Sequence, residues 1–358
     1  MMMTDAEKAA TEVILGVDTH LDVHVAVALD HLGRRLGELS VPTTAKGYER
    51  LVRWAEGFGT LRCAGVEGTS SYGAAITRYL RTAEIAVTEV ERPKRRHLHR
   101  SSKSDSRDAE SAARAVLAGE TAGEPKSADG RVELIRALRT ARRSALKSRT
   151  QAANQLQGLR VTAPEELRHR LRRLSTKELV AVAARFRLGD APCDVLAATK
   201  FALRSVARRY EALSAEIDEL DAQLDRLVRQ VAPELVCLAG IGTDHAATLL
   251  TVAGDNPQRL RSEASFASLC GVSPVEASSG KVVRHRLNRG GNRDANRALH
   301  MVCLARMRRD PHTREYVARR TAEGKSKREI IRCLKRYVAR ETYRVLVSCV
   351  ACSSLTRP

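Results

Sequence analysis

Four acidic residues of the chain could together bind divalent metal ions: Asp18, Glu67, Asp105 and Asp108. Asp18 and Glu67 each end a short apolar run that is typical of a buried strand. Asp105 and Asp108 stand three residues apart at the start of a predicted helix, a spacing that brings their Cβ atoms to about 5–6 Å. Taken singly, each acid could be a turn or capping residue. Taken together, they favour a site for Mg²⁺, which prefers oxygen donors, and two ions about 3.5–4 Å apart would suit phosphodiester chemistry.

A second group of residues could supply a nucleophile. Ser278 and Ser279 precede Gly280 in a loop, and a set of cationic residues follows: Lys281, Arg284, Arg286, Arg289 and Arg293. A serine in such surroundings suits attack on a phosphate, because the cations would stabilise charge on the phosphoryl oxygens. A solvated Ser-Gly turn before a basic DNA-contacting strand explains the same residues without catalysis.

The charge of the chain indicates a polyanionic partner. In its 358 residues Lys and Arg outnumber Asp and Glu by 62 to 42, a formal net charge of +20. This excess points to nucleic acid. Aromatic residues make up only 3%, which disfavours base-stacking platforms. The N-terminus has no apolar signal segment and no apolar run reaches the length of about 20 residues that spans a bilayer, so we expect a cytoplasmic protein with no membrane partner.

The elements that must position the acids alternate along the first 120 residues. Strands are predicted at residues 13–17, 23–28, 36–41, 63–66 and 85–90, and helices at 44–58, 71–82 and 105–118. Three strands joined by short turns, followed by alternating strands and helices, predict a mixed sheet with helices packed on it. The stretch 119–129, rich in Gly, Pro, Ala and Ser, is expected to be a linker.

The remainder of the chain is predicted to be mostly helical. A helix is expected over about 131–160, and from Leu203 to Val231 the apolar positions repeat with 3-4 spacing, which is typical of a coiled coil. Heptads leave open whether the partner helix lies in the same chain or in a second copy. Gly240 and Gly242 lie in a turn between two predicted helices that is similar to a helix-hairpin-helix, whose backbone N–H groups can hold a DNA phosphate; a mere helical turn is the other interpretation.

Six short motifs in this order resemble those of the DEDD transposases of the insertion sequence 110 family, described as bridge-RNA-guided serine recombinases. They begin at Gly16 (GVDTH), Gly65 (GVEGT), Lys103 (KSDSRDA), Leu238 (LAGIG), Ser278 (SSGK) and Arg289 (RGGNR). The resemblance covers nearly the full length. Ser104 stands where many relatives carry Thr, which leaves the acids in place.

The resemblance implies a fold of the α/β plus α class in three parts. These are a RuvC-like domain of ribonuclease H fold at 11–125, a helical and coiled-coil insertion at 126–232, and a C-terminal transposase domain at 233–350.

The resemblance also implies the site and its partners. Asp18, Glu67, Asp105 and Asp108 would bind Mg²⁺, in all two ions. Ser279, with Ser278 as the alternative, would form a covalent phosphoserine link to DNA. Gly240, Gly242, Lys281, Arg284, Arg286, Arg289 and Arg293 would contact nucleic acid. Double-stranded donor and target DNA, a structured non-coding RNA and a homo-oligomer (dimer or tetramer) are the expected partners. A junction nuclease using metal-activated water and a non-enzymatic architectural nucleic-acid binder are the alternatives.

Overall fold

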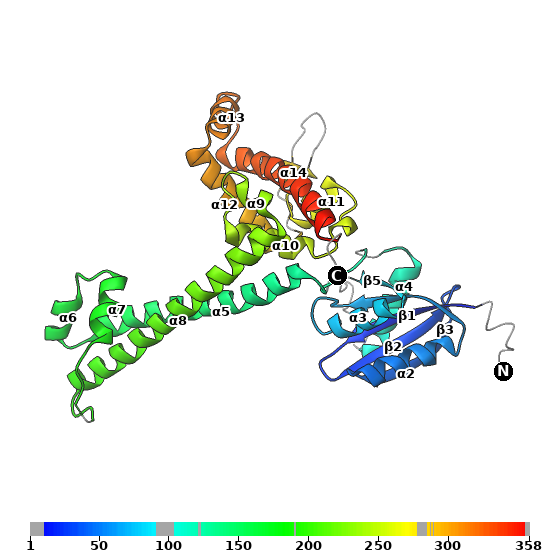
Figure 1. Cartoon of the computed structure of the whole chain (residues 1–358), viewed down its shortest axis with the longest axis horizontal. Coiled ribbons are helices and arrows are strands. Elements are labelled where there is room, and N and C mark those ends of the chain that lie inside the picture. Colours follow the sequence, from blue (N-terminus) through cyan, green and yellow to red (C-terminus); the bar gives the residue numbers. More distant parts are fainter. Residues whose placement is uncertain are drawn as a thin grey trace. The chain divides into compact units, whose positions relative to one another are not determined.

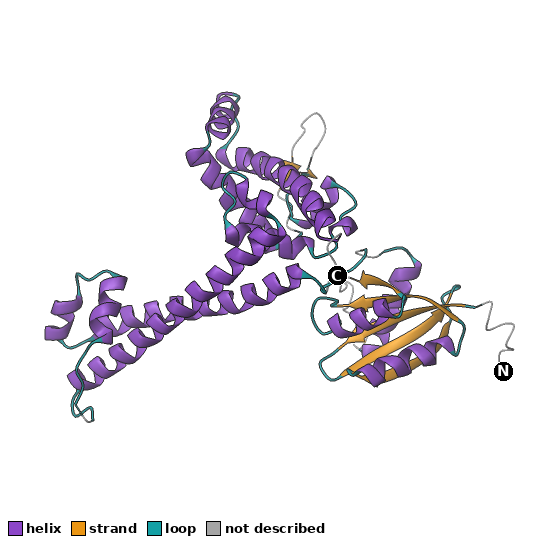
Figure 2. Ribbon diagram, viewed as in Figure 1, coloured by secondary structure: helices purple, strands orange, loops and turns teal. Residues whose placement is uncertain are grey.

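A computed structural model describes residues 11–90, 104–120, 123–189, 191–277, 285–286, 288 and 290–354. The chain divides into two compact units (Figures 1 and 2). One unit comprises Met1–Gly130 and Ala253–Phe266, and the other comprises Arg131–Val252 and Ala267–Pro358.

The first unit is built on a five-stranded sheet. Its strands are β1 (Glu12–Thr19), β2 (Val23–Asp30), β3 (Arg35–Pro42), β4 (Thr60–Glu67) and β5 (Ala86–Val90), and their order across the sheet is β3-β2-β1-β4-β5. The first three strands are antiparallel neighbours, whereas β4 lies parallel to both β1 and β5. The five predicted strands are therefore confirmed. A mixed sheet followed by a mostly helical region fits the RuvC-like fold that the resemblance implies.

Helices cover both faces of this sheet (Figure 2). On one face α2 (Ala45–Glu56) and α3 (Ala74–Thr82) bury an apolar core that includes Leu15, Val66 and Leu51. On the other face α4 (Asp105–Leu117) packs on a smaller cluster with Ile14 and Ala109. Because successive strand residues point to opposite faces, the residues at even positions of β1 meet α4.

Two glycines let α4 approach the sheet closely. A Cβ atom at Gly16 would overlap the carbonyl oxygen of Ala109 and lie 2.5 Å from the backbone nitrogen of Ala113. A Cβ atom at Gly65 would lie 2.8 Å from the carbonyl oxygen of Ala112. The backbone of α4 therefore rests on these two strands with no side chain between.

The predicted linker at 119–129 is tied down, contrary to expectation. Gly123 forms a β-bridge with Glu89. The buried amide of Asn256 accepts a hydrogen bond from the Ser127 N–H at 2.9 Å and donates one to the carbonyl oxygen of Pro125 at 3.0 Å. Asn256 lies about 130 residues further along the chain, directly before the 3-10 turn η2 (Pro257–Arg259). The composition of residues 119–129 alone could not reveal this contact.

The second unit contains a pair of long helices packed along each other, α5 (Arg131–Thr162) and α8 (Val195–Val231), with α6 (Glu165–Leu171) and α7 (Thr176–Ala184) between them in the chain (Figure 1). The heptad positions Leu203, Ile217, Leu224 and Val231 are buried, which confirms an apolar seam on α8. That seam is covered within the same chain by α5; whether a second copy also packs there stays a prediction.

The rest of the second unit is made of shorter elements. They are α9 (Pro233–Cys237), α10 (Thr243–Ala253), α11 (Glu263–Leu269, shared with the first unit), the two-stranded hairpin β6 (Val275–Glu276) and β7 (His285–Arg286), α12 (Arg293–Arg309), α13 (Pro311–Ala322) and α14 (Lys327–Ser354).

The contact at Gly16 generates a stability prediction. Gly16→Ala should lower the free energy of unfolding of the first unit by about 3 kcal/mol, the upper end of overpacking costs, because the added methyl group meets rigid helix backbone. Chemical denaturation followed by circular dichroism measures this. Gly158→Ala in α5 is the matched control, since nothing lies within 4 Å of its added Cβ. Equal effects of both substitutions would contradict the close approach.

Candidate functional site

The strand register brings Asp18 and Glu67 to one face of the sheet. Val17 pairs with Val66 in the parallel β1–β4 ladder, so the next residues along, Asp18 and Glu67, continue side by side. Both are buried, with 4% and 5% of their surface exposed. Alternation along each strand puts them on the face of Gly16 and Gly65, which is the face that α4 covers.

The first turn of α4 carries the other two acids. The hydroxyl of Ser104 caps the helix by accepting a hydrogen bond from the Arg107 N–H at 3.3 Å. Asp105 and Asp108 lie in the first turn, where the helix dipole favours negative charge. The predicted helix start and its acidic first turn are thus confirmed.

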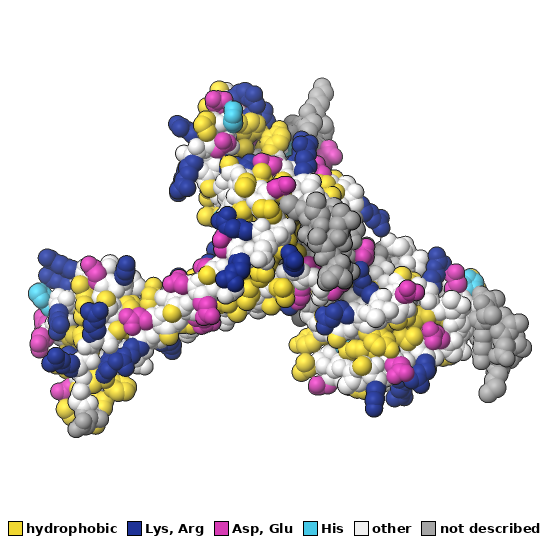
Figure 3. All heavy atoms as spheres, in the orientation of Figure 1, with side chains coloured by type: hydrophobic (Ala, Val, Ile, Leu, Met, Phe, Trp, Pro, Cys, Tyr) yellow, Lys and Arg dark blue, Asp and Glu magenta, His cyan; other side chains and the backbone are white. Residues whose placement is uncertain are grey.

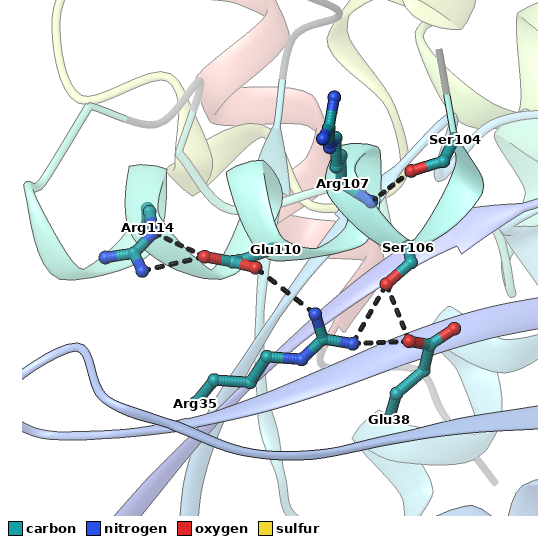
Figure 4. Close-up of polar contacts among 7 residues, drawn as sticks. All are labelled: Arg35, Glu38, Ser104, Ser106, Arg107, Glu110 and Arg114. Atoms are coloured by element: carbon teal, nitrogen blue, oxygen red, sulfur yellow. Dashed lines mark hydrogen bonds and ion pairs between the residues drawn. The ribbon is translucent and has the colours of Figure 1, made fainter. Parts of the chain in front are cut away.

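A polar network holds this turn against β3 (Figure 4). Arg35 donates a hydrogen bond to the Ser106 hydroxyl at 3.0 Å, and that hydroxyl donates to Glu38 at 2.7 Å. Arg35 also lies 3.7 Å from Glu110, which accepts two hydrogen bonds from Arg114. Each exposed contact stabilises little by itself, but together they fix which side of α4 faces the strands.

The structure gathers three donors into one group: Asp18, His20 and Asp105. The His20 Nε2 atom lies 3.1 Å from Asp18 Oδ2 and 3.5 Å from Asp105 Oδ2. One ligand atom from each residue lies within 4.8 Å of the others. Glu67 and Asp108 are outside this group. His20 stands two residues after Asp18 and was not predicted as a ligand, although a histidine beside an acid at a strand end was a usable signal.

The surroundings of Asp18 disfavour its negatively charged form. Burial raises its pKa above the ordinary value, and the nearby charges of Asp108 and Asp105 raise it further, while His20 lowers it. Asp108 therefore belongs to the same electrostatic cluster although it is outside the group of three donors. A cation placed among these carboxylates would relieve the repulsion.

The geometry of the group fits one divalent ion. Neighbouring ligands at right angles on an ion with bonds of about 2.1–2.5 Å lie about 3.0–3.5 Å apart. The His20 Nε2 atom lies at such distances, 3.1 and 3.5 Å, from the carboxylate oxygens of Asp18 and Asp105. The carboxylates suit Mg²⁺ or Mn²⁺, whereas an imidazole suits Mn²⁺ better than Mg²⁺ because it is a softer donor. Both fit the divalent metal binding expected of DEDD transposases.

The predicted nucleophile belongs to the second unit. Ser278, Ser279, Lys281, Arg284 and Arg289 lie outside the described residues. The described flanks form the β6–β7 hairpin, in which Val275 pairs with Arg286 and Glu276 with His285. Of the predicted cationic contacts to nucleic acid, Arg286 and Arg293 are described, and both are exposed.

The glycines of the RGGNR motif support the backbone near this hairpin. A Cβ atom at Gly291 would overlap the backbone nitrogen of Gly271 and lie 2.7 Å from the Ser268 carbonyl oxygen. Gly271 and Gly291 both have positive φ, at 64° and 81°. Asn292 caps α12 by accepting hydrogen bonds from the N–H groups of Asp294 and Ala295, each at 3.0 Å. These residues therefore fix the chain on either side of the β6–β7 hairpin.

The Gly-Ile-Gly turn lies between α9 and α10 in the second unit. Gly240 has a φ of +77° and packs against α12, where an added Cβ would lie 3.2 Å from the Val302 carbonyl oxygen. Nothing lies within 4 Å of an added Cβ at Gly242. A close helix contact thus explains Gly240, and phosphate binding at this turn stays a prediction.

Basic side chains are widespread on the surface. In the face drawn in Figure 3, Lys and Arg gather over α6 and α7 and around α13. None of the helices in the described part of the chain is both long enough and apolar enough to cross a membrane.

The chain matches two models of transposase families. Residues 15–162, which contain the acidic cluster, match the DEDD transposases of the IS110 type, described as "Transposase". Residues 233–318 match a model described as "Transposase IS116/IS110/IS902 family".

Two curated proteins are similar over part of the chain. The insertion element IS110 uncharacterized 43.6 kDa protein of Streptomyces coelicolor is 34% identical over 125 residues, which are 34% of this chain and 31% of that protein. The insertion element IS900 uncharacterized 42 kDa protein of Mycobacterium paratuberculosis is 29% identical over 148 residues, which are 40% of this chain and 37% of that protein. Each alignment thus covers about a third of the curated relative.

The mixed sheet, the acidic cluster at its strand ends and the helical remainder fit the class of DEDD transposases, whose family model matches residues 15–162. The two family matches cover both the acidic and the serine-bearing parts of the chain, in the expected order. The protein belongs to the IS110 family of transposases.

The raised pKa of Asp18 generates a prediction about stability without metal. In chelator near pH 7, Asp18→Asn should raise the melting temperature, because the wild-type carboxylate is charged in surroundings that favour its protonated form. Below the ordinary pKa of 3.8 the carboxyl group is protonated in both the folded and the unfolded state, so the difference should disappear. Scanning calorimetry over this pH range measures both.

Asp22→Asn is the control, since Asp22 is exposed and lies outside the group of three donors. A lower melting temperature of Asp18→Asn near pH 7 in chelator would contradict this account of the cluster.

Proposed function

We propose that the protein is the transposase that excises and inserts its own insertion sequence, as a Mg²⁺-dependent serine recombinase acting on double-stranded DNA. The observation that carries the proposal is the grouping of Asp18, His20 and Asp105 within 4.8 Å at the strand ends of the IS110-type domain. The family model over residues 233–318, which contain the SSGK motif, supports the serine chemistry.

The acidic residues would hold the metal. Asp18 and Asp105 would be ligands, Glu67 and Asp108 would complete the acidic set, and two Mg²⁺ ions is the proposed stoichiometry. A bound divalent ion would supply positive charge that polarises the phosphoryl oxygens. The His20 Nε2 atom lies 3.1 Å from Asp18 Oδ2. In the tautomer that leaves this nitrogen unprotonated, His20 would add a nitrogen donor to the site.

The serine would carry the covalent step. The Ser279 oxygen forms a bond to phosphorus as the bond from phosphorus to the leaving sugar oxygen breaks, and that oxygen leaves as a hydroxyl once protonated. The serine proton passes to a base in the site. The resulting phosphoserine ester retains the energy of the phosphodiester, so the strand can be rejoined to a new partner without an external energy source.

The buried thiols of the second unit do not compete for this role. Burial raises the pKa of Cys270 and of Cys303 to about 12, which leaves both thiols protonated at neutral pH. A thiol in that state is a poor nucleophile.

Guidance by a structured non-coding RNA and assembly into a homo-oligomer belong to the proposal through the family resemblance. A cytoplasmic location belongs to it as well. Arg286 and Arg293 are the described cations offered to the nucleic acid, with Lys281, Arg284, Arg289 and the Gly240–Gly242 turn as the further predicted contacts.

Metal binding has a readout that does not depend on activity. Saturating Mg²⁺ should stabilise the wild-type protein, by about 2.7 kcal/mol at a concentration of 100 times Kd. Asp18→Asn and Asp105→Asn should lose this stabilisation, whereas Asp22→Asn should keep it. His20→Ala should weaken stabilisation by Mn²⁺ more than that by Mg²⁺. Melting curves with and without each ion test this, and an unchanged response of Asp18→Asn would refute the site.

The covalent step is tested with duplex DNA that carries the ends of the element and with RNA from the same element. Denaturing gels should show protein linked to DNA, and Ser279→Ala should abolish the adduct while Ser278→Ala retains it. An adduct that persists in Ser279→Ala and is lost in Ser278→Ala would move the nucleophile by one residue. Strand cleavage by the double variant Ser278→Ala/Ser279→Ala would instead favour the junction nuclease. Full transposition by Asp18→Ala would favour the architectural nucleic-acid binder.

A further inference from the structure

The second unit contains a cavity of about 630 Å³ between α14 and the loop that precedes the β6–β7 hairpin. One wall is formed by residues 271–274 together with β7, and the other by one face of α14 and Lys325. This volume falls in the range of small-molecule sites, about 300–1,000 Å³. Most of the residues that line it carry charged or polar side chains.

The charges around this cavity are strongly unbalanced. The residues that line it include six Lys and Arg side chains and one carboxylate: Arg286, Lys325, Arg332, Lys335, Arg336, Arg340 and Glu329. Glu329 accepts hydrogen bonds from the N–H and the hydroxyl of Ser326, and its distance to Arg332 is 4.0 Å. Among the described residues, neither Arg286 nor Lys325 has an ion-pair partner. Positive charge therefore exceeds negative charge among the residues that line the cavity.

Three of the arginines follow one face of α14. Arg332, Arg336 and Arg340 are four residues apart, so they stand in a row that advances about 6 Å per step. That step is similar to the distance between successive phosphates of a nucleic acid strand. Burial and the charge of Arg340 lower the pKa of Arg336, as expected where like charges crowd together.

The wall opposite this row is held in place from inside the unit. The buried Lys335 ammonium donates a hydrogen bond to Asn296 Oδ1 at 3.0 Å, and Asn296 donates to the carbonyl oxygens of Cys270 and Gly271 at 3.0 and 2.9 Å. This chain of contacts links α14 through α12 to the loop at Gly271. The row of arginines and the β6–β7 hairpin thus face each other in a fixed arrangement.

We propose that this cavity binds the sugar-phosphate backbone of a DNA strand, with successive phosphates on Arg332, Arg336 and Arg340 and with Arg286 contacting the strand from the hairpin side. The proposal rests on the proposed function in one respect, that the strand is the one cut at the serine loop between β6 and β7. Phosphate contacts of this kind position a strand without reading its sequence.

The test measures how salt affects DNA binding by the full-length protein in chelator, where no metal-dependent chemistry occurs. Fluorescence anisotropy of a labelled DNA duplex gives the slope of log K against log salt concentration. Arg332→Gln/Arg340→Gln should reduce that slope by about 1.8, since each phosphate contact contributes about 0.9. Arg309→Gln/Arg314→Gln is the matched control, with the same charge change on exposed residues of α12 and α13 outside the cavity. The control pair should leave the slope unchanged.

A second variant guards against misfolding, which melting curves of each protein would detect. Arg286→Gln changes the cavity from the hairpin side without altering α14 and should reduce the slope by about 0.9. Equal slopes for the cavity and control pairs would overturn the proposal. The same titrations with an RNA duplex of the same sequence are a further check: a slope that the cavity variants reduce for RNA but not for DNA would also overturn it. Because binding in chelator requires neither the acidic cluster nor the serine, these results are independent of whether the protein forms the covalent adduct.

Discussion

The close approach of α4 to the sheet is the constraint on which the candidate metal site depends. Gly16 and Gly65 present bare backbone to the carbonyl oxygens of Ala109 and Ala112. Two residues further along each strand, on the same face, stand Asp18 and Glu67. If α4 lay one side chain further out, Asp105 would not come within 3.5 Å of His20, which itself contacts Asp18. In each of the two motifs, the glycine allows α4 to pack closely, and the acid two residues later is a candidate member of the metal site.

The second unit uses the same principle at a different place. The positive φ of Gly271 and Gly291 allows two loop backbones to meet, and this contact fixes the chain on either side of the β6–β7 hairpin. The cations of α14 then face the hairpin through the link from Lys335 to Asn296. In both units, close backbone contacts and side-chain hydrogen bonds together position the residues that would handle charge.

Much of the fold could be predicted from the sequence because its signals are local. Short apolar runs and alternating apolar residues predicted the five strands, and the acids at 105 and 108 mark the first turn of α4, which Ser104 caps. Contacts between residues distant in sequence could not be predicted. The composition of residues 119–129 is that of a linker, and the hydrogen bonds that hold this stretch in place go to Asn256, far along the chain. His20 was missed because only the sheet and α4 together bring it between two carboxylates. The helix α8 begins at Val195, eight residues before the heptads, where the Asp194 side chain caps it.

We infer that α4 and the strand ends form one metal site. A crystal structure of the protein soaked in Mn²⁺, with the ion located by its anomalous scattering, tests this inference. We expect an anomalous peak within bonding distance, about 2.0–2.3 Å, of Asp18 and Asp105 carboxylate oxygens, with the His20 imidazole next to it. A well-occupied Mn²⁺ ion elsewhere, with none between these residues, would contradict it.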